Sequence, residues 1–153
     1  MTDATPPVTL TPVGPDNWRT CAELTVTDAQ SAFVAPVTRY LTLCAYDDGP
    51  WRPFAVDARG RIVGFVMFGV DPADNSAWIG GLVIDSAEQR RGYGRAAVLA
   101  LVEVARRDSR SFVALTYEPA NQVAKTLYAD LGFAETGETD GDEVVARLNL
   151  DPD

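Results

Sequence analysis

The sequence predicts an α/β fold with a mixed sheet and helices on both of its faces. Short runs rich in β-branched and aromatic residues alternate with segments of helical periodicity. Two consecutive runs are joined by a turn as a hairpin, and a glycine-rich loop connects a short apolar strand to a helix. With 153 residues, of which 46% are hydrophobic, the chain is long enough to bury a core, and we expect a single domain over residues 1–153.

The first third of the chain predicts one strand and two helical pieces. Asp16 is the expected N-cap of the first helix, because a short acceptor side chain there meets free helical N–H groups. Thr27 or Asp28 is expected to cap the second piece, which Pro36 interrupts. The expected ranges are the strand 8–13, a helix through residues 18–24, and a second helical piece that resumes over 40–45.

The middle of the chain predicts three strands followed by a long helix. Ala58-Arg59-Gly60 and residues 71–75 are typical of turns and separate the three strands. The helix carries apolar residues at a spacing of three and four. The expected ranges are the strands 54–57, 62–70 and 76–85 and the helix 95–107.

The last third predicts a strand, a helix and a closing strand pair. In the helix, Val123, Ala124, Leu127 and Leu131 share one face, and Gly132 is the expected end. The closing pair surrounds a turn at Thr139-Asp140-Gly141. The expected ranges are the strands 111–117, 133–136 and 143–150 and the helix 120–131.

Composition excludes several classes of function. The chain has no histidine, which excludes Ser-His-Asp and Cys-His nucleophiles and a histidine-based zinc site, and we expect no metal. A net charge of −9 argues against general nucleic-acid binding. The basic residues are concentrated in one helix and its flanks, an asymmetry that would attract an anion to one side and a cation to the other. They are Arg90, Arg91, Arg95, Arg106, Arg107 and Arg110.

The sequence also indicates a cytoplasmic protein. No apolar run approaches the ~18 residues that a membrane span needs, so no membrane association is expected. The first ten residues lack the basic and apolar regions of a secretion signal. Two cysteines, Cys21 and Cys44, fit a reducing compartment, where they are most simply small core residues.

The glycine-rich loop 89–94, Gln-Arg-Arg-Gly-Tyr-Gly, predicts an anion site at the start of a helix. Free N–H groups, the positive end of the helix dipole and nearby arginines would converge there, which suits a pyrophosphate. A P-loop is excluded, because Arg95-Ala96 replaces the required lysine and hydroxyl residue. A dinucleotide-binding fingerprint fits the letters G-x-G-x-x-A, but the loop begins too far after Ile84 and Ala114 stands where an acidic residue is wanted.

The loop also spells Q-x-x-G-x-G through Gln89, Gly92 and Gly94, the phosphate-binding signature of the GCN5-related N-acetyltransferases (GNAT family), which the chain resembles. Residues 121–133 match a second signature of that family, N-x-x-A-x-x-L-Y-x-x-L-G-F, and the order of elements agrees over nearly the whole chain. The resemblance implies a mostly antiparallel sheet that splays between its fourth and fifth strands, acetyl-CoA as co-substrate and often a homodimer.

By this resemblance, backbone groups of the fourth strand pair with the pantetheine arm and loop amides hold the pyrophosphate. The residues implied for acetyl-CoA are Leu82, Val83, Ile84, Gln89, Arg90, Arg91, Gly92, Tyr93, Gly94, Arg95, Ala96, Asn121 and Tyr128.

The resemblance also implies catalytic roles for an acetyl transfer by direct attack. Tyr128 matches the family's tyrosine acid, and with a reference pKa of ~10 its phenol is protonated at neutral pH. A backbone N–H of Val83 or a neighbour is the expected oxyanion donor. Glu118 ends the fifth strand and is a candidate base for the amine, although it is equally well explained as a surface carboxylate.

The acceptor is expected to be a small cationic amine. Phe33-Val34-Ala35-Pro36, the hairpin and the closing segment resemble the bacterial polyamine (spermine or spermidine) acetyltransferase branch, which fits the acidic net charge. Gly80-Gly81 replaces an Asp-Arg pair that is frequent in that branch, which leaves room for a bulkier amine as an alternative. Two further alternatives are acetylation of proteins or peptides and a non-catalytic acyl-CoA-binding module.

Overall fold

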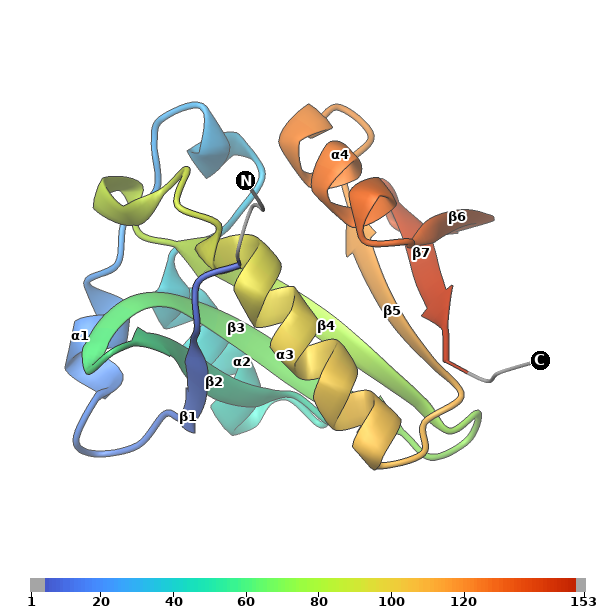
Figure 1. Ribbon diagram of the computed structural model, residues 1–153, viewed down its shortest axis with the longest axis horizontal. Coiled ribbons are helices and arrows are strands. Elements are labelled where there is room, and N and C mark those ends of the chain that lie inside the picture. The colour runs from blue at the N-terminus through green and yellow to red at the C-terminus, as the bar shows by residue number, and fades with distance from the viewer. Residues whose placement is uncertain (1–4, 151–153) are drawn as a thin grey trace.

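The computed structural model describes residues 5–150, which form a seven-stranded sheet in the order β1-β2-β3-β4-β5-β7-β6 with helices on both faces (Figure 1). The strands are β1 (Thr9–Pro12), β2 (Arg52–Ala58), β3 (Arg61–Asp71), β4 (Ser76–Ile84), β5 (Phe112–Tyr117), β6 (Ala134–Asp140) and β7 (Glu143–Asn149). The helices are α1 (Trp18–Ala22), α2 (Val37–Tyr46), α3 (Tyr93–Arg107) and α4 (Gln122–Asp130), with 3-10 turns at Gln30–Ala32 and Ser86–Glu88. The predicted mixed α/β sheet is confirmed.

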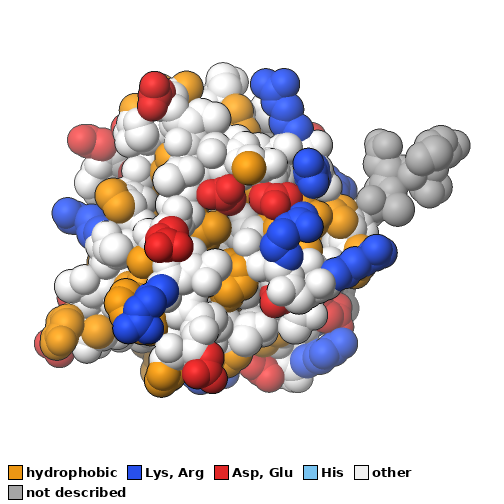
Figure 2. Space-filling model, turned by 90° about the vertical axis from the view of Figure 1, so that its left-hand side faces the viewer, with side chains coloured by type: hydrophobic (Ala, Val, Ile, Leu, Met, Phe, Trp, Pro, Cys, Tyr) orange, Lys and Arg blue, Asp and Glu red, His pale blue; other side chains and the backbone are white. Residues whose placement is uncertain are grey.

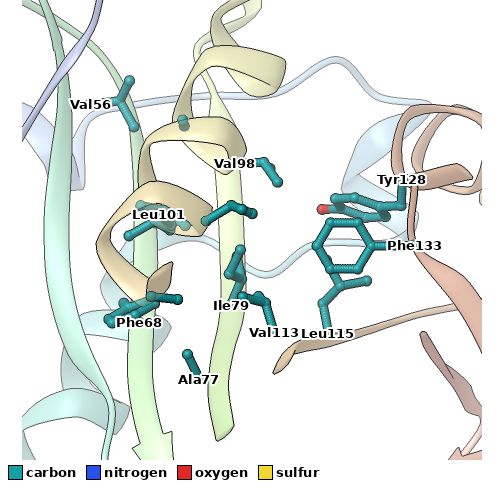
Figure 3. Close-up of a cluster of buried hydrophobic side chains, with 14 of the residues drawn as sticks. Val56, Phe68, Ala77, Ile79, Val98, Leu101, Val113, Leu115, Tyr128 and Phe133 are labelled. Atoms are coloured by element: carbon teal, nitrogen blue, oxygen red, sulfur yellow. The ribbon is translucent and has the colours of Figure 1, made fainter. Parts of the chain in front are cut away.

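Two apolar layers hold the helices to the sheet. On one face α3 packs on β3, β4 and β5 through side chains such as Val98, Leu101 and Val113, and Tyr128 of α4 joins the same layer (Figure 3). On the other face Cys21 of α1 and Val37 of α2 pack on Phe65. Because consecutive strand residues point to opposite faces, β2, β3 and β4 contribute to both layers.

The sheet opens between β4 and β5. These two strands pair in parallel only over Ser76–Trp78 and 112–114, although β4 continues to Ile84 and β5 to Tyr117. All the other strand pairs are antiparallel. A bulge lies in β4 at the point of divergence, because Phe65 and Met67 of β3 face Val83 and Gly80, which leaves one extra residue on β4. Gly81 at this bulge has a φ of 58°.

The boundaries of several elements differ from the sequence prediction. Asn17, not Asp16, is the N-cap of α1, and its side chain accepts a hydrogen bond from the N–H of Gly14 instead of capping the helix. Helix α2 begins directly after the extended Pro36, earlier than expected, because proline suits the start of a helix.

Two differences lie closer to the functional loop and the closing hairpin. Helix α3 begins at Tyr93, two residues before the expected Arg95. Strand β6 extends to Asp140, because Thr139 and Asp140 pair with β7, which moves the turn to residues 141–142.

The surface carries charge unevenly. On the face shown in Figure 2 most Lys and Arg side chains lie toward one side, and acidic side chains are scattered over the rest. Within residues 5–150, no helix combines the length and apolar character that crossing a membrane requires. The prediction that the first ten residues are not a secretion signal falls partly on residues 1–4, which lie outside the described residues.

Candidate active site

A cleft of about 980 Å³ lies at the opening between β4 and β5. Its volume lies at the upper end of the range of small-molecule sites. Both faces of the sheet contribute to it, because Tyr128 and Leu115 belong to the α3 layer while Tyr40 and Met67 belong to the α2 layer. The cleft therefore connects the two faces through the gap in the sheet.

One end of the cleft is the loop before α3. Arg90 and Gly92 have φ values of 66° and 85°, a left-handed conformation that is costly for arginine. Helix α3 has no side-chain cap among the described residues, and its first backbone bond runs from the N–H of Ala96 to the carbonyl of Gly92 at 3.0 Å. The N–H groups of Tyr93, Gly94 and Arg95 are therefore free of helical partners, which is the arrangement that binds anions.

The side chains of this loop make different contacts. The amide Nε2 of Gln89 donates to the carbonyl of Ile84 at 2.9 Å, which anchors the loop to the end of β4. The guanidinium of Arg91 is turned to Glu88, which lies 3.4 Å away and also pairs with Arg61 at 3.0 Å. Arg90 lines the cleft, whereas Arg91, Arg95 and the buried Ala96 do not.

The walls next to this loop come from β4 and α4. Leu82, Val83 and Ile84 all line the cleft, on the part of β4 that has no β5 partner. Backbone groups on that edge are left to pair with another molecule. On the opposite wall Asn121 caps α4, since its Oδ1 accepts a hydrogen bond from the N–H of Ala124 at 3.2 Å, while its Nδ2 stays able to donate.

Tyr128 lines the cleft and is 8% exposed. Its ring stacks on Tyr117 with centroids 5.8 Å apart and meets Phe133 edge-on at 5.9 Å. Its oxygen points away from α4 toward the α3 side (Figure 3). Burial, and secondarily the charge of Tyr117, raises the pKa of Tyr128 to about 12, so its phenol is a donor at neutral pH. No described residue forms a hydrogen bond with it.

Tyr117 and Glu118, at the end of β5, differ in whether their side chains already have a hydrogen-bond partner. The hydroxyl of Tyr117 donates to Oε2 of Glu135 at 2.8 Å, and burial together with this bond raises the pKa of Tyr117 to about 12. Glu118 follows directly and lines the cleft, as Tyr128 does. The Tyr117 hydroxyl therefore has a partner already, while Glu118 lines the cleft and forms no ion pair within residues 5–150.

The other end of the cleft is aromatic. Tyr40, Trp51 and Trp78 line it on the α2 face, and the phenol of Tyr40 accepts a hydrogen bond from the N–H of Ala35 at 3.0 Å. A Cβ at Gly80 would lie 3.0 Å from Cη2 of Trp51, and one at Gly81 would lie 3.1 Å from Cγ of Tyr40. The two rings therefore pack against these glycines, which themselves line the cleft, and the expectation of room for a bulkier amine stays a prediction.

Sequence reasoning did not find two acidic residues of this end, Asp140 and Glu143, which flank the turn between β6 and β7 and line the cleft. The sequence singles out the closing segment that contains them only for its resemblance to the polyamine branch, and it gives neither residue a role in the site. The register of β7 against β5 brings them to the opening, and no local pattern encodes that register. Among residues 5–150, no group of Cys, Asp and Glu has the arrangement of a metal site.

Comparison with known proteins identifies the family. Residues 18–133 match the model of the acetyltransferase (GNAT) family. No curated protein matches the chain.

Solved structures with the same fold include three acetyltransferases. Spermidine N-acetyltransferase from Vibrio cholerae, in complex with CoA and spermine, is 19% identical over 92% of both chains with a TM-score of 0.70. The ribosomal-protein-S18-alanine N-acetyltransferase from Escherichia coli is 17% identical over 95% of this chain and 96% of that one, with a TM-score of 0.72. The GNAT domain of S. lividans PAT is 19% identical over 94% and 89%, also with a TM-score of 0.72. The chain belongs to the GNAT family and is an acetyl-CoA-dependent N-acetyltransferase.

Proposed function

We propose that the protein transfers the acetyl group of acetyl-CoA to the primary amine of a small cationic substrate by direct attack. The observation that carries this proposal is the cleft through the sheet, which has an anion-binding loop at one end and carboxylates with aromatic rings at the other. Arg90 is the only Lys or Arg among the described residues that line it, and it lies at the loop end. The two ends therefore suit an anionic donor and a cationic acceptor.

The residues at the loop end fit the coenzyme. The free N–H groups at the start of α3 would hold its diphosphate, with Arg90 close by. The edge of β4 at Leu82, Val83 and Ile84 has no β5 partner and would offer backbone groups to the amides of the pantetheine arm, apart from the Ile84 carbonyl, which accepts from Gln89. Arg91 and Arg95 would contribute through their backbone, because their side chains do not line the cleft, whereas the N–H of Ala96 already donates to the carbonyl of Gly92.

Three groups of the protein would take part in the acetyl transfer, for which bound acetyl-CoA supplies the activated thioester. Glu118 accepts the proton that an alkylammonium must lose before it attacks. The N–H of Val83 or a neighbour stabilises the oxygen as negative charge develops on it. Tyr128 donates a hydrogen bond to the departing sulfur; because its pKa of about 12 exceeds the ~8.5 of a thiol, it stabilises the thiolate without having to be ionised.

Polyamine-like acceptors are the best match to the acidic end. The carboxylates of Glu118, Asp140 and Glu143 line it together with tyrosine and tryptophan rings, and cations are attracted both to carboxylates and to aromatic faces. The net charge of −9 would also attract a cationic substrate toward the protein.

The experiment that tests this function is release of free CoA from acetyl-CoA in the presence of a panel of acceptors. The panel contains monoamines, linear diamines, polyamines, an aminoglycoside and a peptide with a free N-terminus. We expect polyamines and diamines to give the highest kcat/KM. Turnover of the peptide alone would replace the small-amine proposal, and tight CoA binding without turnover of any acceptor would show a binding module.

A further inference from the structure

The acidic end of the cleft contains one carboxylate that is held in place by a neighbouring strand. Glu143 is the first residue of β7, and its Oε1 accepts a hydrogen bond from Oγ1 of Thr116 on β5 at 2.6 Å. Its second oxygen remains able to accept from another molecule. The side chain is partly buried and lines the cleft. Glu143 is therefore a carboxylate with a fixed position and a free acceptor atom.

Strand alternation places Glu143 on the α2 face of the sheet. Leu115, Tyr117 and Val144 belong to the α3 layer, so the residues between and beside them point the other way. Thr116 pairs with Val145, which lies two residues after Glu143 on the same face. Tyr128 lies in the α3 layer. Glu143 and Tyr128 therefore approach the opening from opposite sides of the sheet.

Glu143 has no cationic partner within residues 5–150, where the ion pairs are formed by Glu88 and Glu103. The negative charge of Glu143 acts on Tyr40: burial is the main cause that raises the pKa of Tyr40, and the charge of Glu143 raises it further. Trp51 and Trp78 line the same end. A partly buried carboxylate among aromatic rings favours a cation as its ligand.

We propose that Glu143 binds a second, non-reacting ammonium group of the acceptor and so selects diamines over monoamines. The reacting nitrogen must lie at the thioester near Tyr128 and must have lost its extra proton. The ammonium at the other end of the acceptor keeps its proton and reaches the α2 face, where Glu143 lies. This inference rests on the proposed function and specifies which substrates that function favours.

The test compares a linear diamine with the monoamine of the same chain length in wild type and three variants. Glu143→Gln keeps an oxygen for the Thr116 hydroxyl but removes the charge, Glu143→Asp keeps the charge, and Asp142→Asn removes an adjacent, exposed carboxylate that does not line the cleft. Wild type is expected to prefer the diamine. The Gln variant should raise the KM for the diamine by about tenfold or more, as expected for loss of a charged hydrogen bond, with the monoamine unchanged. Asp142→Asn should behave as wild type, and Glu143→Asp should recover part of the preference.

Calorimetric titration of the CoA-loaded protein with the diamine gives a second readout, and the Gln variant should bind it more weakly by the same factor. Retained preference and binding in Glu143→Gln would overturn the inference while leaving amine acetylation intact. Equal use of diamine and monoamine by the wild type would do the same. A wild type that acetylates no amine would overturn both proposals.

Discussion

Replacement of Tyr128 by phenylalanine isolates the chemical role of one hydroxyl group. The ring contacts with Tyr117 and Phe133, at 5.8 and 5.9 Å, do not depend on that hydroxyl. Because no described residue hydrogen-bonds the phenol, its removal leaves no partner unsatisfied. We therefore expect Tyr128→Phe to fold with a free energy of unfolding close to that of the wild type at neutral pH.

The expected loss lies in the rate. A positioned proton or hydrogen-bond donor contributes roughly 10²- to 10⁴-fold to a transfer reaction, and here it acts in a buried site, 8% exposed, where water does not replace it easily. We expect kcat to fall by at least about 10²-fold, which corresponds to ~3 kcal/mol of barrier. The affinity for CoA should change little, because the donor assists the departing thiolate more than the ground state.

The assay measures initial rates of thiol release with a saturating diamine, and titration calorimetry measures CoA affinity in the same preparations. Tyr117→Phe is the matched control, because its hydroxyl is bound to Glu135 and is not available to the sulfur. A Tyr128→Phe variant with wild-type kcat would refute the role given to the phenol. A large loss of CoA affinity with unchanged kcat would assign it to binding instead.

Three further predictions follow from the same site. Gly94→Asp should fold, because a Cβ at this position would lie 3.7 Å from Ile84, an ordinary contact distance. The new carboxylate should weaken CoA binding about 100-fold or more by charge repulsion, while Gly94→Ala should weaken it far less. Equal CoA affinities of the two variants in calorimetry would contradict this prediction. Glu118→Gln should lower kcat roughly 100-fold near neutral pH, and its kcat should approach that of the wild type above pH ~10, where the acceptor amine is already deprotonated and needs no base. A ratio of wild-type to variant kcat that stays constant across the pH profile would exclude Glu118 as the base. The raised pKa of Tyr128, about 12 against about 10 unfolded, contributes stability that is complete below pH ~10 and is lost as pH rises toward 12, by up to about 2 kcal/mol. Urea unfolding of Tyr128→Phe should therefore show a flatter decline over that interval, and an equal slope would contradict the assignment.

Local chemistry explains what the sequence predicted well. The hydrophobic period of the strands and of α3 determines which residues are buried, so the order and type of most elements could be read before the structure was known. The loop with Gly92 and Gly94 was also predictable, because glycine permits the left-handed φ of 85° at Gly92 and a close backbone approach at Gly94. The functional roles given to these residues remain predictions.

Tertiary pairing explains what the sequence did not predict. The register of β7 against β5 brings Glu143 to the opening, and Tyr40 and Trp51 pack against Gly80 and Gly81. The side chain of Arg91 pairs with Glu88 instead of facing the cleft. Each of these depends on residues distant in the chain, which a motif does not specify.

We infer that the coenzyme passes through the gap between β4 and β5, and the proposed chemistry depends on this path. The most direct measurement is an experimental structure of the protein with CoA. We expect a diphosphate within hydrogen-bond distance of backbone nitrogens between Gln89 and Ala96, a pantetheine arm paired with Leu82, Val83 or Ile84, and a sulfur next to the Tyr128 hydroxyl. CoA bound at any other surface, with this opening filled only by solvent, would contradict it.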